Sequence, residues 1–109
     1  MICKDLECVI GVARRILEKE GVITENFNVI ITDLPYTTLS VVEGSTVKIN
    51  SLLLENYSNS VNNEARLVSA FLLIAILNAF LKDKAKTRNI IRKYFGEESI
   101  EEKAVDVIL

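Results

Sequence analysis

Residues 64–81 read EARLVSAFLLIAILNAFL and are apolar almost without interruption from Ala70 to Leu77. A helix that is apolar on every side must be covered on several sides. A membrane span needs about 20 consecutive apolar residues, and Arg66 and Ser69 shorten this run. The segment is therefore predicted to be a buried core helix, with Asn62 or Asn63 as its N-cap.

The segment 3–20 is predicted to form an amphipathic helix that packs one face on this core. Apolar residues recur in it at i, i+3 and i+4, the spacing of one helical face. Gly21 follows at the position where helices commonly end in a left-handed residue. Because Arg14 and Arg15 lie away from the apolar face, we expect them to pair with Glu18.

Three strands are predicted between these two helices. A β-branched run makes residues 28–33 the first strand, which ends at the Leu34-Pro35 break. Residues 36–43 and 46–50 form the second and third strands, joined as a hairpin whose turn contains Gly44. The hairpin residues expected to face one another across the pair are Leu39, Val41, Val47 and Ile49.

A short helix and a polar loop are predicted between the hairpin and the core helix. Ser51 can cap a helix over residues 52–56. The polar residues 57–63 that follow favour a mobile surface loop.

Two further helices are predicted after the core helix. Residues 86–95 form the first, which stops at Gly96. Residues 99–109 form the second, opened by a capping box of Ser99 and Glu102.

The whole chain, residues 1–109, is predicted to be a single α+β domain. Its 109 residues suit one domain that buries about two-thirds of its unfolded surface. Half of the residues are hydrophobic and 26% are charged, which argues against disorder. The order of elements predicts an N-terminal helix, a small three-stranded mostly antiparallel sheet, a central buried helix and two or three C-terminal helices.

The sequence contains no histidine. This excludes Ser-His-Asp and Cys-His centres, zinc sites with imidazole ligands and an imidazole base near neutral pH. The four glycines form no phosphate-binding loop. We therefore predict a protein that is not an enzyme, with no catalytic, cofactor-binding or metal-ligating residue. The alternative is an enzyme that uses Asp, Glu, Lys or Tyr alone, although nothing assembles Tyr36, Tyr57 and Tyr94 into a site.

The two cysteines, Cys3 and Cys8, are expected to be buried and reduced. On a continuous helix, residues five apart lie about 140° apart around the axis, so these thiols would not pair. Met1 to Asp5 lack the basic and apolar regions of a signal peptide. We therefore expect an intracellular, cytoplasmic protein.

The segment 82–93 contains six of the 13 Lys and Arg residues, in a chain whose net charge is −2. Arg88 and Arg92 lie one turn apart, so they share a helix face that could contact phosphates. No stacking motif or recognition-helix signature accompanies them. A solvated helix, partly neutralised by the acidic tail, is the interpretation we favour. The candidate nucleic-acid-binding residues are Lys82, Lys84, Lys86, Arg88, Arg92 and Lys93.

The acidic residues are not expected to form a metal or acid–base site. Those of the C-terminal region lack the spacing of a calcium loop, and two of them open a helix, where negative charge is favoured. Asp33 adjoins the Leu34-Pro35 break and is explained best as a turn residue. The C-terminal acids are Glu97, Glu98, Glu101 and Glu102.

Asn78 is a polar residue in the most apolar helix, and Ser69 lies one face away. An unsatisfied buried amide is costly. We therefore expect Asn78 to find a hydrogen-bond partner or to lie at the helix edge or at an interface.

Two stretches before the core helix carry a family resemblance. Residues 20–35 read EGVITENFNVIITDLP and residues 44–56 read GSTVKINSLLLEN. Followed by a polar loop and an apolar helix, they resemble the minimal zincin metallopeptidases, ImmA/IrrE-like ones especially. In that family a strand and a Leu-Pro turn precede a hairpin whose last strand ends in hydrophobic-x-hydrophobic-Asn. Val47-Lys48-Ile49-Asn50 is the closest match, and the resemblance spans residues 21–81.

The chain departs from that family where the H-E-x-x-H zinc motif belongs. The core helix reads AFLLIAIL at residues 70–77, with no His to bind zinc and no Glu to activate water. No ligand or catalytic residue is carried over. The resemblance therefore implies a catalytically dead relic in which Phe71, Leu72 and Ala75 fill the former site. A coincidental packing of a hairpin on a helix is the alternative.

The leading functional hypothesis is a non-enzymatic interaction domain that binds itself, as a homodimer or higher oligomer, or another protein. The core helix is apolar enough to need more cover than three short strands and amphipathic helices supply, which favours a partner. The alternative is a nucleic-acid-binding or regulatory protein that uses residues 82–93.

Overall fold

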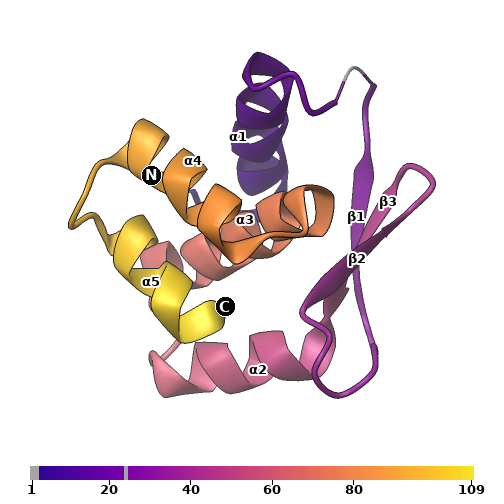
Figure 1. Ribbon diagram of the computed structural model, residues 1–109. Coiled ribbons are helices and arrows are strands. Elements are labelled where there is room, and N and C mark those ends of the chain that lie inside the picture. The colour runs from indigo at the N-terminus through magenta and orange to yellow at the C-terminus, as the bar shows by residue number, and fades with distance from the viewer. Residues whose placement is uncertain (1–2, 24) are drawn as a thin grey trace.

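The computed structural model describes residues 3–23 and 25–109 (Figure 1). Within these ranges the elements are α1 (Leu6–Lys19), β1 (Asn28–Thr32), β2 (Ser40–Glu43), β3 (Thr46–Asn50), α2 (Ser51–Ser60), α3 (Ala65–Leu81), α4 (Lys84–Phe95) and α5 (Ile100–Ile108). The predicted α+β class, with a helix first and a small sheet before the remaining helices, is confirmed. Met1 and Ile2, examined above for a signal peptide, and Thr24, within the zincin comparison, lie outside the described residues.

The sheet has the strand order β1-β3-β2 and is mixed. The predicted hairpin of β2 and β3 is antiparallel, whereas β1 and β3 run parallel, with Val29 opposite Val47. The chain reverses direction between β1 and β2 and again between β2 and β3, so β3 runs the same way as β1. The expectation of a mostly antiparallel sheet therefore holds only for the hairpin.

The hairpin register differs from the expected one by one residue on β2. Val42, not Val41, lies opposite Val47, and Val41 lies opposite Lys48. Because side chains alternate between the faces of a strand, Val42 faces the core and Val41 faces outward with Lys48. The strand also begins later than predicted, because Thr38 donates to the carbonyl of Pro35 in a turn (2.9 Å).

The helix α3 lies at the centre of the fold, as predicted. Every residue from Ser69 to Leu77 is at most 8% exposed. The helix contacts β2 and β3 of the sheet and the four other helices, which lie with it to one side of the strands in Figure 1. The Ser40 hydroxyl of β2 also donates to the Ala75 carbonyl (2.7 Å). The chain thus covers α3 by itself, and the expectation that this helix needs a partner for cover is wrong.

Two helix starts differ from the prediction because a different side chain caps each helix. The Asn50 carboxamide oxygen accepts from the amides of Leu52 and Leu53, so α2 begins at Ser51 and runs to Ser60, through much of the expected loop 57–63. Hydrogen bonds within the helix outweigh the low helix propensity of these polar residues.

The cap of α3 is Glu64, whose carboxylate accepts from the amides of Arg66 and Leu67. Asn62 and Asn63, the predicted caps, take left-handed conformations with φ of 54° and 56°. Asn tolerates this region better than most residues, so the pair turns the chain between α2 and α3.

The cap of α4 is Asp83, which accepts from the Lys86 amide, and this helix therefore begins at Lys84. The Ser99 cap of α5 is confirmed, because its hydroxyl accepts from the Glu102 amide. The reciprocal hydrogen bond of the expected capping box is not formed, because the Glu102 carboxylate pairs with Arg92 and the Ser99 amide donates to the Gly96 carbonyl (3.4 Å). Gly96, with φ of 93°, ends α4 as predicted.

Cys3 and Cys8 form a disulfide, with Cα atoms 5.5 Å apart, so the expectation of reduced thiols is wrong. Asp5 caps α1, which begins at Leu6. Cys3 therefore precedes the helix, and the 140° separation expected on a continuous helix does not apply. Cys3 is buried, and its carbonyl accepts from the Ser69 hydroxyl of α3 (3.3 Å).

Neither Arg14 nor Arg15 forms the expected ion pair with Glu18 among the ion pairs of the described residues. Arg14 lies instead against an aromatic ring. Its guanidinium carbon lies 5.9 Å from the centre of the Phe27 ring, within cation–π range. Phe27 in turn packs edge-on against Phe80 of α3, with ring centres 5.1 Å apart. Arg14 therefore connects α1 to Phe27, the residue directly before β1.

Among the helices described in residues 3–23 and 25–109, none has both the length and the hydropathy that crossing a bilayer requires.

Candidate interaction surface

The region of α3 that the zincin resemblance singles out lies inside the core. Phe71, Leu72 and Ala75 are all buried. The Phe71 ring packs on Tyr57 of α2, with ring centres 5.2 Å apart. In the described part of the chain, no group of three or more Cys, Asp or Glu side chains is placed to hold a metal ion.

The shared face of Arg88 and Arg92 is confirmed, and it lies against α5. Arg88 pairs with Asp106, and the Arg92 Nε lies 2.9 Å from a carboxylate oxygen of Glu102. Glu102 is buried, so the guanidinium supplies its charge partner. These ion pairs hold two consecutive helices together and occupy the two cations that were the best phosphate candidates.

Lys93 pairs with an acid that is distant in the sequence. Its Nζ lies 2.8 Å from Glu20 at the end of α1, and the Tyr94 hydroxyl donates to the same carboxylate oxygen (2.7 Å). The hydrogen bonds from Lys93 and Tyr94 hold the pKa of Glu20 below its ordinary value. The hydrogen bond to Glu20 raises the pKa of Lys93 and that of Tyr94. The three side chains therefore fasten α4 to α1.

The other three cations of the segment lie at its start and are exposed. Lys84 lies 3.8 Å from Asp106, while Lys82 ends α3 in a left-handed conformation with φ of 57°. For Lys82 and Lys86, no acidic side chain among the described residues lies within ion-pair distance. The segment 82–93 therefore does not present its six cations together.

Lys82 and Lys84 border a cavity of about 620 Å³ between β2, the α3–α4 junction and the C-terminal residues. Asn78 also lines it, and its carboxamide oxygen lies 3.2 Å from the hydroxyl of Thr87. Asn78 is thus half-buried at the edge of α3 with a partner, which satisfies the sequence expectation.

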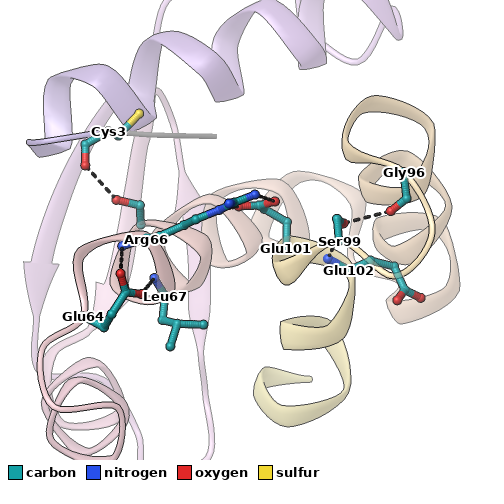
Figure 2. A network of polar contacts seen from close by, with 9 residues as sticks. Cys3, Glu64, Arg66, Leu67, Gly96, Ser99, Glu101 and Glu102 are labelled. Carbon is teal, nitrogen blue, oxygen red and sulfur yellow. Dashed lines mark hydrogen bonds and ion pairs between the residues drawn. The ribbon is translucent and has the colours of Figure 1, made fainter.

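The acidic residues divide between the core and the surface. Glu101 is 0% exposed, and both of its carboxylate oxygens receive hydrogen bonds from the Arg66 guanidinium of α3 (3.2 and 3.3 Å; Figure 2). Burial alone would raise the pKa of Glu101, but the hydrogen bonds from Arg66 and from the Glu101 backbone amide, together with nearby positive charge, lower it by more, so the pKa lies below its ordinary value. Glu98 lies 3.6 Å from Lys103 at the surface, and Glu97 is exposed. Asp33 accepts a hydrogen bond from Ser51 (2.7 Å), as suits a residue at a break.

An apolar groove of about 300 Å³ runs between α2, α3 and α5. Val107 is 73% exposed at its border, and Ile100 is 37% exposed. The remaining apolar residues that line it are Tyr57, Val61, Leu67 and Ala104.

The strand β1 forms an open edge of the sheet, because β3 is its only hydrogen-bonded neighbour among the described strands. Its sequence, NVIIT, contains no charge and no proline. Ile30 and Ile31 are each 43% exposed although they point to opposite faces. Natural edge strands are commonly protected by charged residues, prolines or covering segments. This one carries none of these residues.

The sequence alone did not single out Ile30, Ile31 or Val107. A signal for the first two exists, since a β-branched run without charge is unusual for an edge strand. Recognising it requires knowing that β1 lies at the edge, which depends on the parallel pairing with β3.

Comparison of the chain with family models, with curated proteins and with solved structures finds no match.

Proposed function

We propose that the chain is a non-enzymatic protein interaction domain that associates with itself. The open, uncharged edge strand β1, with Ile30 and Ile31 each 43% exposed, is the observation that carries the proposal. Exposed strand edges offer unpaired backbone groups to another strand. The apolar groove beside Val107, between three helices, is a second exposed apolar surface.

The proposal that the chain is not an enzyme is supported by the structural role of its ionisable side chains. Most of the described charge pairs join one helix to another: Arg66 to Glu101, Arg92 to Glu102, and Lys93 to Glu20. Groups with a shifted pKa often mark functional sites, but structural ion pairs shift pKa values in the same way. Among the described residues, the two carboxylates with a shifted pKa, Glu20 and Glu101, belong to such pairs, and burial raises the pKa of Tyr57.

The nucleic-acid hypothesis is the second candidate, and the exposed Lys82, Lys84 and Lys86 are what remains in its favour. The ion pairs of Arg88, Arg92 and Lys93 count against it, because a phosphate would have to compete with a fixed carboxylate.

Descent from a zincin-like peptidase also remains a proposal, supported by the order of elements over residues 21–81. It predicts related chains with His, Glu and His at the positions of Phe71, Leu72 and Ala75. Related chains that all keep apolar residues at these positions would contradict it.

The cytoplasmic location expected from the sequence is a proposal too, and the Cys3–Cys8 disulfide weighs against it. Disulfides persist mainly in oxidising compartments. Alkylation under denaturing conditions in freshly lysed cells tests this proposal, since a cytoplasmic chain should carry two free thiols, one of them buried in the folded state.

Light scattering across a dilution series tests the interaction proposal. We expect the mass to fall from that of an oligomer to the 12.2 kDa of one chain as the concentration decreases. A mass of one chain at every concentration would defeat the proposal.

A further inference from the structure

The backbone of β1 determines which kind of partner can bind its open edge. The Asn28 amide donates to the Ser45 carbonyl (2.9 Å), so the backbone groups of Asn28 point toward β3. Directions alternate along a strand. The N–H and C=O groups of Val29 and Ile31 therefore point away from the sheet, and an extended strand is the segment that can satisfy them.

We propose, building on the self-association proposed above, that two copies of this chain join by antiparallel pairing of β1 with β1, centred on Ile30. A twofold axis at Ile30 places Val29 opposite Ile31 of the second copy, and Ile31 opposite Val29. Both are pairs whose backbone groups face each other, so each pair forms two hydrogen bonds. Every outward-pointing group within β1 is then satisfied.

The side chains of β1 fit the same register. Ile30 lies directly opposite Ile30 of the second copy, on the sheet face away from the helices, in the closely spaced type of antiparallel pair. Val29 and Ile31 form apolar pairs on the other face. No charged residue of β1 opposes another, and the chain's net charge of −2 adds little repulsion between copies.

A second copy of this chain is a better partner for the open edge of β1 than a strand of another protein, because the β1 sequence is complementary to itself in this register. Symmetric, isologous contacts are the commonest form of soluble homodimer. The contact is small, since β1 has five residues. Interfaces of less than about 1,200 Å² in total are typically weak, so we expect a dimer that dissociates on dilution.

Paired charge variants test this register by light scattering. Ile30→Lys and Ile30→Glu each place like charges opposite one another, and each is expected to weaken the dimer at least about tenfold. Ile30 is half-exposed, so both variants should fold, which circular dichroism checks. An equimolar mixture of the two variants should restore the dimer, because Lys then faces Glu. Val107→Lys, in the apolar groove, is the matched control and should leave the dimer intact.

The outcomes separate this inference from the function on which it rests. If the wild-type chain is a monomer throughout, both fail. If the Ile30 variants still dimerise while Val107→Lys does not, self-association stands and β1 pairing is overturned. Failure of the mixture to restore the dimer would overturn the register centred on Ile30.

Hydrogen exchange gives a second measurement that needs no variant. The amides of Val29 and Ile31 should be protected at high concentration and lose protection at least about tenfold on dilution. The Asn28 amide, bonded to Ser45, should stay protected in both conditions. Fast exchange of Val29 and Ile31 in a sample shown to be dimeric would overturn the inference.

Discussion

Arg66 of α3 and Glu101 of α5 form a two-point ion pair in which the Glu101 carboxylate is inaccessible to solvent (Figure 2). Arg66 is 38% exposed at its side chain, so water reaches one partner of the pair and not the other. Removing the carboxylate therefore leaves a cation that water can solvate, whereas removing the guanidinium takes two hydrogen bonds and a charge partner from a buried carboxylate.

Glu101→Gln should lower the free energy of unfolding by about 1.5–3 kcal/mol, because it replaces hydrogen bonds to a charged group with neutral ones. Arg66→Met should cost more than Glu101→Gln, for the reason just given. Urea denaturation of the three proteins measures both differences. Lys103→Gln is the control and should change the free energy by less than about 1 kcal/mol, because its pair with Glu98 is exposed. Equal stability of wild type and Glu101→Gln would contradict the structural role of this pair.

The contact of Glu20 with Lys93 and Tyr94 predicts a stability that depends on pH at both extremes. The pKa of Glu20 is lowered by these hydrogen bonds, so its contribution is present above the ordinary value of 4.5 and is lost as pH falls through the folded-state pKa. The pKa values of Lys93 and Tyr94 are raised, so their contribution is present below about 10 and is lost as pH rises through the folded-state values.

A Glu20→Gln variant isolates this contact. Its loss of unfolding free energy relative to wild type should be greatest near pH 7 and should shrink in acid below 4.5 and in alkali above 10.5. Urea titrations at several pH values measure the difference. A difference that stays constant across this range would show that the contact does not contribute.

The Cys3–Cys8 bond predicts a moderate dependence on reductant. Closing so short a loop, with a sequence separation of 5, is worth about 2 kcal/mol in the chain-entropy model. Dithiothreitol should lower the free energy of unfolding by about that amount. The variant with both cysteines replaced by Ser should be equally unstable with and without reductant. Two thiols that react with an alkylating reagent in the unfolded, unreduced chain would contradict the bond, and unfolding is needed because Cys3 is buried.

The basic segment gives opposite predictions under the two functional hypotheses. If its arginines stay in their ion pairs, we expect no retention on single-stranded or duplex DNA at about 50 mM salt. Arg92→Ala should instead lower stability, since Glu102 is buried and loses its partner. Salt-sensitive retention that disappears when Lys86, Arg88 and Arg92 become Ala would favour the nucleic-acid hypothesis.

The elements that the sequence predicted well are those in which the spacing of apolar residues shows which side chains are buried. The uninterrupted apolar run of α3 and the spaced apolar positions of α1 both identify the core, because burial of apolar surface dominates the folding free energy. The Ser99 cap of α5 was also readable, since it acts within one turn of the helix, although the Glu102 carboxylate pairs with Arg92 instead of completing the capping box.

The features that the sequence did not reveal depend on contacts between distant segments. The parallel pairing of β1 with β3 leaves no local pattern, and so the open edge at Ile30 was not foreseen. The charges of Arg92 and Lys93 looked like one basic run, although their partners, Glu102 and Glu20, come from two other helices. The disulfide was missed because α1 starts after Cys3.

Light scattering of the wild-type chain and the two Ile30 variants, from about 1 μM to about 1 mM, tests self-association through β1 most directly. We predict a wild-type mass that rises toward twice the 12.2 kDa of one chain, a monomer for Ile30→Lys and Ile30→Glu separately, and a dimer when the two are mixed. A wild-type mass that stays at 12.2 kDa throughout the series would contradict the proposed function and the pairing together.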